Sequence, residues 1–248
     1  MCASLTAVAA IGLTLVACQP ASAAPVYNAI SAFDAAWTAG SGNTGSPFSF
    51  GYAADLSGAF TAFSQAKSFG PNNVFHTLSP SAQDISPDLL CPMVFHNTSE
   101  NQMASGSVVL PGNELAFHPG AFEANQYSII RFTAPQTATY ALNAGFIGRD
   151  NKGTSTTVFV LAAGQQVFTH DVNGFNNSPV TCTQTFLLTQ GQTLDIAVGR
   201  GSNGTYYNDS TGLGTNLSIT AVPTPAAVWG GSILAGGLLT ARCLRRKA

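Results

Sequence analysis

The sequence of 248 residues predicts an all-β protein built as an antiparallel β-sandwich. Three observations support this fold class. Apolar and β-branched residues alternate with polar ones at a period of two, the alternating segments are short, and clusters of Gly, Asn and Asp separate them. Short strands at regular spacing between turn residues are typical of sandwiches and barrels.

The first half of the chain is expected to contain one short helix and four strands. Residues 29–39 are the one segment where a short helix is expected. The stretch 72–88 is rich in Pro and Ser, and it is expected to form a long loop. The expected strands of this half cover residues 48–52, 92–96, 107–110 and 114–118.

The second half shows the alternation more clearly than the first. Turn residues at 148–153 and Gly164 separate its segments. The expected strands of this half cover residues 127–133, 140–146, 156–161, 167–172, 185–189, 194–198 and 217–221.

The composition excludes two broad classes of protein. Only 9 basic and 11 acidic residues are present, together with 16 Phe and 25 Gly. Disordered chains are rich in charge and poor in aromatic residues, so this chain is expected to fold. A nucleic-acid-binding protein would carry a basic stripe, whereas the formal net charge here is -2.

The N-terminal segment, 1–23, is expected to be a signal peptide. Residues 7–17 are apolar but too few to span a bilayer, and Ala21-Ser22-Ala23 has the small-x-small pattern of a cleavage site. A second interpretation stays open, because Leu15-Val16-Ala17-Cys18 resembles the lipobox of bacterial lipoproteins. In that case Cys18 would be lipidated and would hold the protein at a membrane.

The C-terminal segment, 222–248, has a proline hinge, an uncharged span at 226–241 and a terminal basic cluster. The residues of this motif are Val222, Pro223, Thr224, Pro225, Arg245, Arg246 and Lys247. The arrangement resembles the PEP-CTERM sorting signal of exported bacterial proteins, with Thr224 in place of the family's central Glu. The resemblance implies a transmembrane sorting helix, transient membrane anchoring and processing by an exosortase-type partner. An ordinary C-terminal membrane anchor is the alternative.

Residues 24–221 remain as a single β-sandwich ectodomain between the two end segments. Five basic residues stand against eleven acidic ones in this range, a formal charge of −6. Such a surface disfavours nucleic acid and anionic lipid as partners.

Cys91 and Cys182 are the two cysteines of the ectodomain. In a chain expected to reach an oxidising compartment, an even pair predicts a disulfide bond. The bond would close a loop of about 90 residues and stabilise the fold by up to about 4 kcal/mol. Two separately buried thiols are the alternative.

A second resemblance covers scattered segments of the ectodomain. The matching segments are 43–52, 117–120, 130–135, 198–204 and 208–213. They resemble a module that recurs in exported PEP-CTERM proteins, with Phe48 and Phe50 where the module usually has Trp and Tyr. The resemblance implies a jelly-roll-like β-sandwich similar to carbohydrate-binding modules.

The sequence contains no recognisable catalytic motif. Its four His residues stand in separate contexts without HxxxH or HExxH spacing, and no GxSxG elbow is present. The acidic residues are scattered, and no two of them can be identified as a carboxylate pair for glycoside hydrolysis. His118, before Pro119-Gly120, is interpreted as a turn residue with a local hydrogen bond. We therefore expect a protein that is not an enzyme.

Aromatic side chains are the candidate glycan contacts, because sugar rings present apolar C–H faces. The three aromatic residues at 48–52 share one strand face, and this stripe is expected to face the core because Phe has no polar group. The tyrosine pair lies in a loop rich in Gly, Asn and Ser, and is preferred as an exposed contact. The aromatic candidates are Trp37, Phe48, Phe50, Tyr52, Tyr206 and Tyr207.

A structural calcium ion needs several oxygen ligands of the kind found in extracellular loops. Asp150-Asn151 and Asn208-Asp209 lie in such loops. Neither pair matches a known calcium-binding pattern, so local Asx turns are the preferred interpretation and no cofactor is expected.

Together these observations predict an exported, non-catalytic protein of the cell surface or the extracellular matrix, processed through its C-terminal tail. The alternative function is carbohydrate binding within exopolysaccharide. An enzyme acting on that polysaccharide is the third hypothesis.

Overall fold

The computed structural model describes residues 24–80, 92–120, 126–214 and 217–222. These residues form seventeen strands, the helix α1 (Ala29–Ala39) and the 3-10 helix η1 (Pro71–Asn73). The first nine strands are β1 (Val26–Asn28), β2 (Phe48–Ala53), β3 (Thr61–Ala62), β4 (Gln65–Phe69), β5 (Phe75–Ser79), β6 (Met93–Asn97), β7 (Met103–Ser105), β8 (Val108–Leu110) and β9 (Leu115–His118). The others are β10 (Tyr127–Thr133), β11 (Ala138–Gly148), β12 (Thr154–Ala162), β13 (Gln165–Gly174), β14 (Val180–Leu188), β15 (Thr193–Arg200), β16 (Thr211–Gly212) and β17 (Ser218–Val222).

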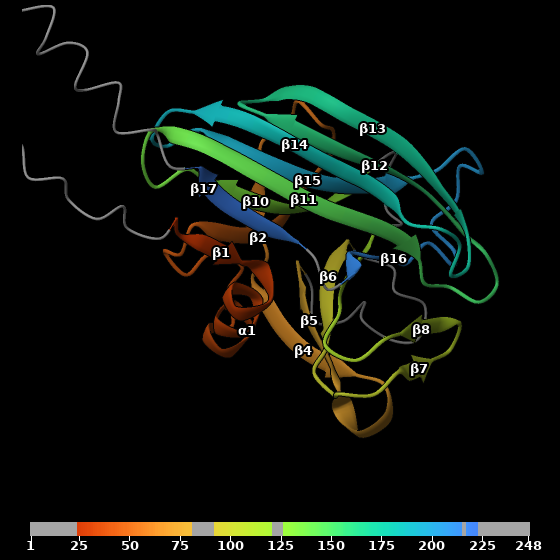
Figure 1. Cartoon of the computed structure of the whole chain (residues 1–248). Helices are drawn as coiled ribbons and strands as arrows, with labels where there is room; N and C mark the ends of the chain where they lie inside the picture. Colours follow the sequence, from red (N-terminus) through yellow and green to blue (C-terminus); the bar gives the residue numbers. More distant parts are fainter. Residues whose placement is uncertain (1–23, 81–91, 121–125, 215–216, 223–248) are drawn as a thin grey trace, which may run out of the picture.

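Two large antiparallel sheets pack on each other as a β-sandwich (Figure 1). One has the strand order β13-β12-β15-β10-β2-β3. The other has the order β1-β17-β11-β16-β9-β6-β5-β4, and β14 pairs with the opposite edge of β11. Figure 1 shows that β4, β5 and the β7–β8 hairpin, together with α1, extend away from the stacked strands β10–β15.

The core between the sheets is made of the alternate side chains that the period-two pattern turns inward. Phe50, Ile130 and Phe132 enter it from the six-stranded sheet, and Tyr140 and Phe146 enter it from β11 of the other sheet. All five side chains are buried. The buried hydroxyl of Tyr140 donates to the carbonyl of Gln136 at 2.7 Å, so its polar group is satisfied.

Local signals fix both ends of α1. The Asn28 side chain accepts a hydrogen bond from the Ser31 N–H at 3.1 Å, which is a standard N-terminal cap. Gly40 ends the helix with φ of 68°, a left-handed conformation that glycine adopts without a Cβ penalty. Phe33 and Ala36 are buried, which attaches the helix to the core next to β2.

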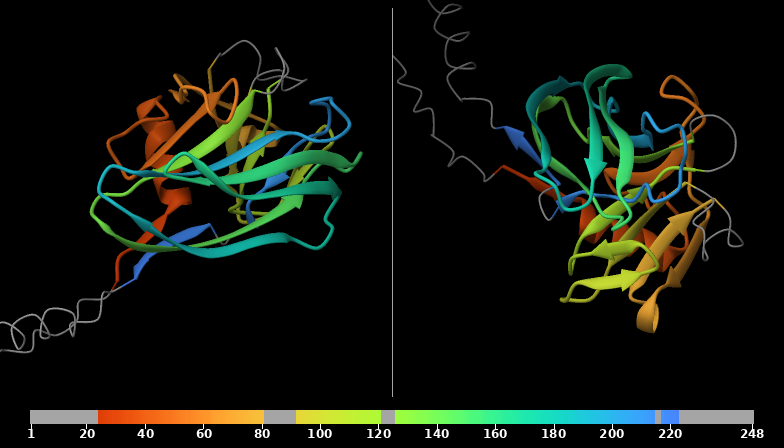
Figure 2. Two further views of the ribbon diagram at one scale, coloured as in Figure 1. Left: turned by 90° about the horizontal axis from the view of Figure 1, so that it is seen from above. Right: turned by 90° about the vertical axis from the view of Figure 1, so that its right-hand side faces the viewer.

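Both ends of the described chain leave the fold at the same place. β1 pairs with β17 in antiparallel register, with Val26 opposite Thr220, and the Ala221 N–H donates to the Pro25 carbonyl at 3.1 Å. Figure 2 shows the same neighbourhood in two further views, with β1 in red beside β17 in blue. The first and the last strand of the described chain therefore lie side by side at one edge of the sheet.

The predicted antiparallel β-sandwich is confirmed. The bounds of α1 and β10 agree with the expected ranges residue for residue, and the strands expected in the second half are present. β14 begins at Val180 instead of residue 185. The expected core stripe in β2 is also confirmed, since Phe48 and Phe50 are buried and Tyr52 packs against the core.

The prediction of a long loop over 72–88 is wrong in its first part, which contains the rest of η1 and β5. β5 pairs with β4 on one side and β6 on the other, and four of its five residues are buried. A strand covered on both faces does not alternate between apolar and polar residues, so the periodicity is lost. The other strands that were not expected, β1, β3, β4, β7 and β16, have at most five residues each.

Several predictions concern segments outside the described residues. These are the signal peptide 1–23 with Cys18, the disulfide partner Cys91 and the sorting motif beyond Val222, and each stays a prediction. In the ranges that the structure describes, no helix combines the length and the apolar character needed to cross a bilayer.

Candidate binding pocket beside β11

A cavity of 390 Å³ opens on the outer face of β11, at the point where this strand changes partner. One edge of β11 pairs with β17 through residues 139–143 and with β16 at Ile147 and Gly148. Among the described residues, 144–146 have no strand partner on that edge, so the sheet divides there. We call this cavity the β11 pocket.

The floor of the β11 pocket is a buried ion pair. Glu114, next to the start of β9, is 1% exposed, and Arg149, directly after β11, is 7% exposed. Arg149 Nε and Nη2 donate to Glu114 Oε1 at 3.2 and 2.9 Å, and Oε2 lies 2.8 Å from Nη2 without an aligned hydrogen bond. The Gly214 N–H donates to Oε1 at 2.8 Å, and Arg149 Nη1 donates to Asn176 Oδ1. The pair therefore fixes two loops against the end of β11.

Burial raises the pKa of the Glu114 carboxyl group, whereas the Arg149 guanidinium and the Gly214 N–H act in the opposite direction. The desolvation cost exceeds the stabilisation from these two donors. Removing either partner would leave the other buried without its counter-charge, which is expensive in a protein interior.

The walls of the β11 pocket are mainly apolar. Pro179 lies on the β14 side of β11 and the buried Leu213 on the β16 side, Ile147 belongs to β11 itself, and Gly145 faces the space between them. A Cβ added at Gly145 would meet only the Cβ of Pro179, at 3.8 Å, which is an ordinary contact. Glycine at this position therefore keeps the pocket open, and the fold itself has room for a side chain there.

The rim of the pocket carries neutral hydrogen-bonding groups. Asn143 on β11 and Thr181 on β14 line it, and both residues are exposed. An amide and a hydroxyl group can each donate and accept hydrogen bonds. The two charged lining residues are paired with each other. The chemistry of the β11 pocket is therefore apolar contact together with neutral hydrogen bonding.

The tyrosine pair chosen from the sequence lies in a different loop. The ring centroids of Tyr206 and Tyr207 are 4.2 Å apart, and the Tyr207 side chain is 58% exposed, as expected. Tyr206 is half-buried, with the Arg200 guanidinium 5.8 Å from its centroid and His118 edge-on at 6.5 Å. The loop thus offers one exposed aromatic ring, and Tyr206 is its support.

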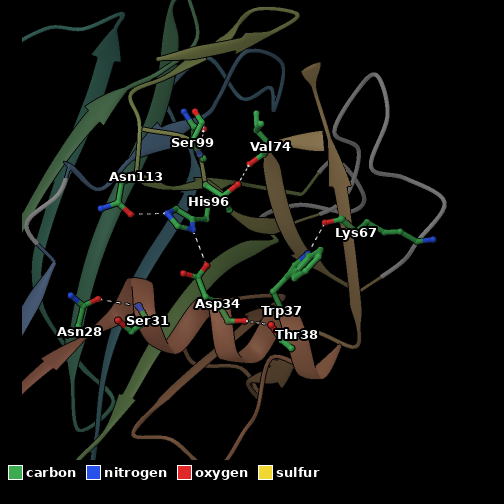
Figure 3. A network of polar contacts seen from close by, with 12 residues as sticks. Asn28, Ser31, Asp34, Trp37, Thr38, Lys67, Val74, His96, Ser99 and Asn113 are labelled. Atoms are coloured by element: carbon green, nitrogen blue, oxygen red, sulfur yellow. Dashed lines mark hydrogen bonds and ion pairs between the residues drawn. The ribbon is translucent and has the colours of Figure 1, made fainter. Parts of the chain in front are cut away.

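Trp37 is half-buried on the side of α1 that faces β4 and β5 (Figure 3). Its ring stacks on His76 with centroids 3.6 Å apart and planes within 6°. Its Nε1–H donates to the carbonyl of Lys67 at 2.8 Å. One ring face and the polar atom of Trp37 are therefore used inside the protein to hold the helix against the sheet.

A second polar contact joins α1 to β6 in the same region, as Figure 3 shows. His96 Nδ1 lies 2.8 Å from Asp34 Oδ1, and its Nε2 lies 3.2 Å from Asn113 Oδ1. His96 is buried, while the Asp34 side chain is 48% exposed. This contact fixes the orientation of the helix. None of its three residues lines the β11 pocket, although Asn113 directly precedes Glu114.

His118 lies at the end of β9 and is buried. Its Nδ1 contacts the carbonyl of Pro119 at 2.8 Å, which confirms the predicted local hydrogen bond. Burial lowers the pKa of His118, partly offset by the nearby Asp150 carboxylate. The imidazole is therefore neutral under ordinary conditions.

The fold brings the two loops considered for calcium close together. Asp150 Oδ1 accepts from the Ser107 hydroxyl at 2.6 Å, and Asp209 Oδ1 accepts from the Ser155 N–H at 3.0 Å. The Ser210 N–H donates to Asp150 Oδ2. The donors to these oxygens lie 43, 54 and 60 residues away in the chain, so the prediction of local Asx turns is wrong for Asp150 and Asp209, whose carboxylates join separate loops instead. Within the described residues, no group of three or more His, Cys, Asp or Glu is placed to hold a metal ion.

Asp209 is the most perturbed carboxyl group of this network. It is wholly buried, and its Oδ2 has no hydrogen-bond partner among the described residues. Burial raises its pKa to about 7, Asp150 adds to this effect, and the Ser155 N–H and Arg200 act against it. The ionisation of Asp209 therefore opposes folding near neutral pH.

Cys182 of β14 is buried next to Ala144 of β11 and has no disulfide partner among the described residues, and burial raises the pKa of its thiol. The predicted partner, Cys91, is outside the described residues. The disulfide bond between them stays a prediction.

Sequence reasoning did not find the β11 pocket. Its parts come from four separate segments, and a buried Glu or Arg looks the same in a sequence as an exposed one. Gly145, at an outward position of a strand with apolar neighbours, is the only unusual residue. A glycine in a strand interior can mark the close approach of a ligand, and that was the available signal.

Comparison with known proteins gives structural similarity alone. No family model and no curated protein matches the sequence. A family 51 carbohydrate-binding module from Clostridium perfringens, solved with methyl-galactose, has a TM-score of 0.33 and 10% identity over 50% of this chain and 86% of its own. The Stig cyclase Fisc from Fischerella sp. TAU has a TM-score of 0.37 and 14% identity over 64% of this chain and 90% of its own. A family 35 carbohydrate-binding module from Clostridium thermocellum has a TM-score of 0.31 and 12% identity over 53% of this chain and 92% of its own.

Proposed function

We propose that this jelly-roll-like β-sandwich is an exported, non-catalytic carbohydrate-binding protein and that the β11 pocket holds one ring of a neutral saccharide. The observation that carries the proposal is the composition of the pocket: apolar walls, a neutral hydrogen-bonding rim and a charge-balanced floor.

The walls and the rim match the two kinds of surface on a sugar ring. Ile147 and Pro179 offer apolar contact to C–H groups, and Asn143 and Thr181 can exchange hydrogen bonds with hydroxyl groups. Small-molecule sites have volumes of about 300–1,000 Å³, and 390 Å³ is at the lower end of that range. This size suits a single ring better than a longer chain.

The charges favour a neutral ligand over an acidic one. The Arg149 guanidinium is directed to Glu114 and Asn176, so it has little capacity left for a ligand carboxylate or sulfate. The formal charge of −6 over residues 24–221 would also repel a polyanion.

Filling the β11 pocket is expected to abolish saccharide binding without unfolding the protein. The variant Gly145→Val places a branched side chain into the cavity, where a Cβ is tolerated and where valine suits a strand. Isothermal titration calorimetry with methyl glycosides of glucose, galactose, mannose and N-acetylglucosamine should give binding for the wild-type protein. We expect Gly145→Val to weaken that binding at least about tenfold, a loss of about 1.4 kcal/mol.

The matched control is Ala141→Val, four residues earlier on the same strand and on the same outer face, outside the pocket lining. It should bind the methyl glycosides as the wild-type protein does. Equal binding by Gly145→Val and Ala141→Val would contradict the assignment of the site to the β11 pocket. Binding of glucuronic acid in preference to glucose would contradict the neutral ligand class.

A further inference from the structure

The outer face of the sheet continues beyond the β11 pocket as rows of paired residues. In register, Asn143 lies between Thr183 of β14 and Ser218 of β17, and the next row has Ala141 between Thr185 and Thr220. The three side chains at β14 positions 181, 183 and 185 are exposed. Thr183 also donates to Asn143 Oδ1 at 3.2 Å, which connects this row to the rim of the pocket.

This face carries no charge. None of the residues of β1, β11, β14 and β17 is acidic or basic, and hydroxyl and amide groups alternate with small residues on the outer positions. In the row farthest from the pocket, Thr139 lies between Leu187 and Val222. Leu187 is 74% exposed and Val222 is 39% exposed. With increasing distance from the pocket, the face therefore offers neutral hydrogen-bonding groups and then apolar surface.

The two ends of this face differ, because the pocket closes one end with side walls and the other end is open. At the level of residues 145–147, Pro179 stands on one side of β11 and Leu213 on the other. From Asn143 back to Thr139, β11 pairs in the plane of the sheet with β14 on one edge and β17 on the other, so these walls end. From Gly145 to Thr139 the strand extends for about 20 Å, at about 3.4 Å per residue. That length can hold several sugar rings.

We infer that the outer face of β14, β11 and β17 is a binding track for a neutral linear oligosaccharide, whose terminal ring occupies the β11 pocket. This inference rests on the proposed function, and it adds the ligand class: chain ends of a neutral polysaccharide. Continuity with the pocket and the absence of charge along the described strands favour this occupant over a charged polymer.

The test compares fragments of increasing length. The ligands for calorimetry of the purified protein are three series of one to five rings: malto-oligosaccharides, cellulose fragments and chitin fragments. In the series that binds, the affinity should rise at least about tenfold with length. The double variant Thr185→Val/Thr220→Val, in the row that flanks Ala141 outside the pocket lining, should lose this gain and keep the affinity for a single ring. The control Thr169→Val, at an exposed position of β13 in the other sheet, should keep both.

The outcomes separate the two proposals. If single rings bind and longer fragments bind no tighter, the track is refuted and the pocket stands. If the double variant keeps the full gain with length, the track is likewise refuted. If no fragment of any length binds, both the track and the proposed function are overturned.

Discussion

Replacing Glu114 with alanine is expected to lower the free energy of unfolding by about 3–5 kcal/mol, because the substitution leaves the Arg149 guanidinium buried without its counter-charge. The loss also removes the acceptor of the Gly214 N–H and so releases one loop of the β11 pocket. We therefore expect saccharide binding to fall together with stability. Urea unfolding followed by tryptophan fluorescence measures the first effect.

Two further variants identify the cause. In Glu114→Gln/Arg149→Met both charges are absent, so this double variant should recover part of the stability that Glu114→Ala loses. The variant Asp34→Asn weakens the contact to His96, and since the Asp34 side chain is 48% exposed we expect a change below about 1 kcal/mol. A loss for Glu114→Ala no larger than that for Asp34→Asn would contradict the buried ion pair as the element that fixes the pocket.

The variant Asp209→Asn is expected to change the pH dependence of stability. Because burial raises the pKa of Asp209 from 3.8 to about 7, the folded protein holds a proton that the unfolded chain releases. The free energy of unfolding therefore falls as the pH rises from about 4 to about 7. The full difference corresponds to about 4 kcal/mol, which is an upper limit.

Asparagine has no proton to lose in this range, so Asp209→Asn should show a flatter profile and exceed the wild-type stability at pH 8. At pH 4 this advantage should be absent. Guanidinium chloride unfolding at several pH values measures the profile for both proteins. The control Asp171→Asn, at an exposed position of β13, should keep the wild-type slope. Parallel profiles for the wild-type protein and Asp209→Asn would contradict the buried, proton-binding state of Asp209.

Much of the fold follows from local sequence signals. Alternation is strong where one strand face is buried and the other exposed, and β10, β11 and β12 were predicted for that reason. The helix α1 was predicted with its correct bounds, and the structure shows the Asn28 cap and the terminal Gly40 that set them. β5 was missed because neighbours cover it on both sides, and two-residue strands such as β16 exist only through their pairing partners.

The candidate site depends on information that the sequence does not hold locally. The tyrosine at 207 was predicted to be exposed, and it is, because the composition of its loop is a local signal. The β11 pocket instead arises where β11 exchanges β17 for β16, which is a property of sheet topology. Glu114 and Arg149 are 35 residues apart in the chain, and only the sheet register makes them the floor of one cavity.

The most direct test of the proposed function is the position of a bound saccharide on the protein. Backbone amide chemical shifts recorded during titration with the methyl glycoside that binds best will report that position. We expect the largest shifts at Gly145, Thr181 and Gly214, with a common dissociation constant that agrees with calorimetry. Shifts confined to the loop of Tyr206 and Tyr207, with the amides of the β11 pocket unchanged, would contradict the account.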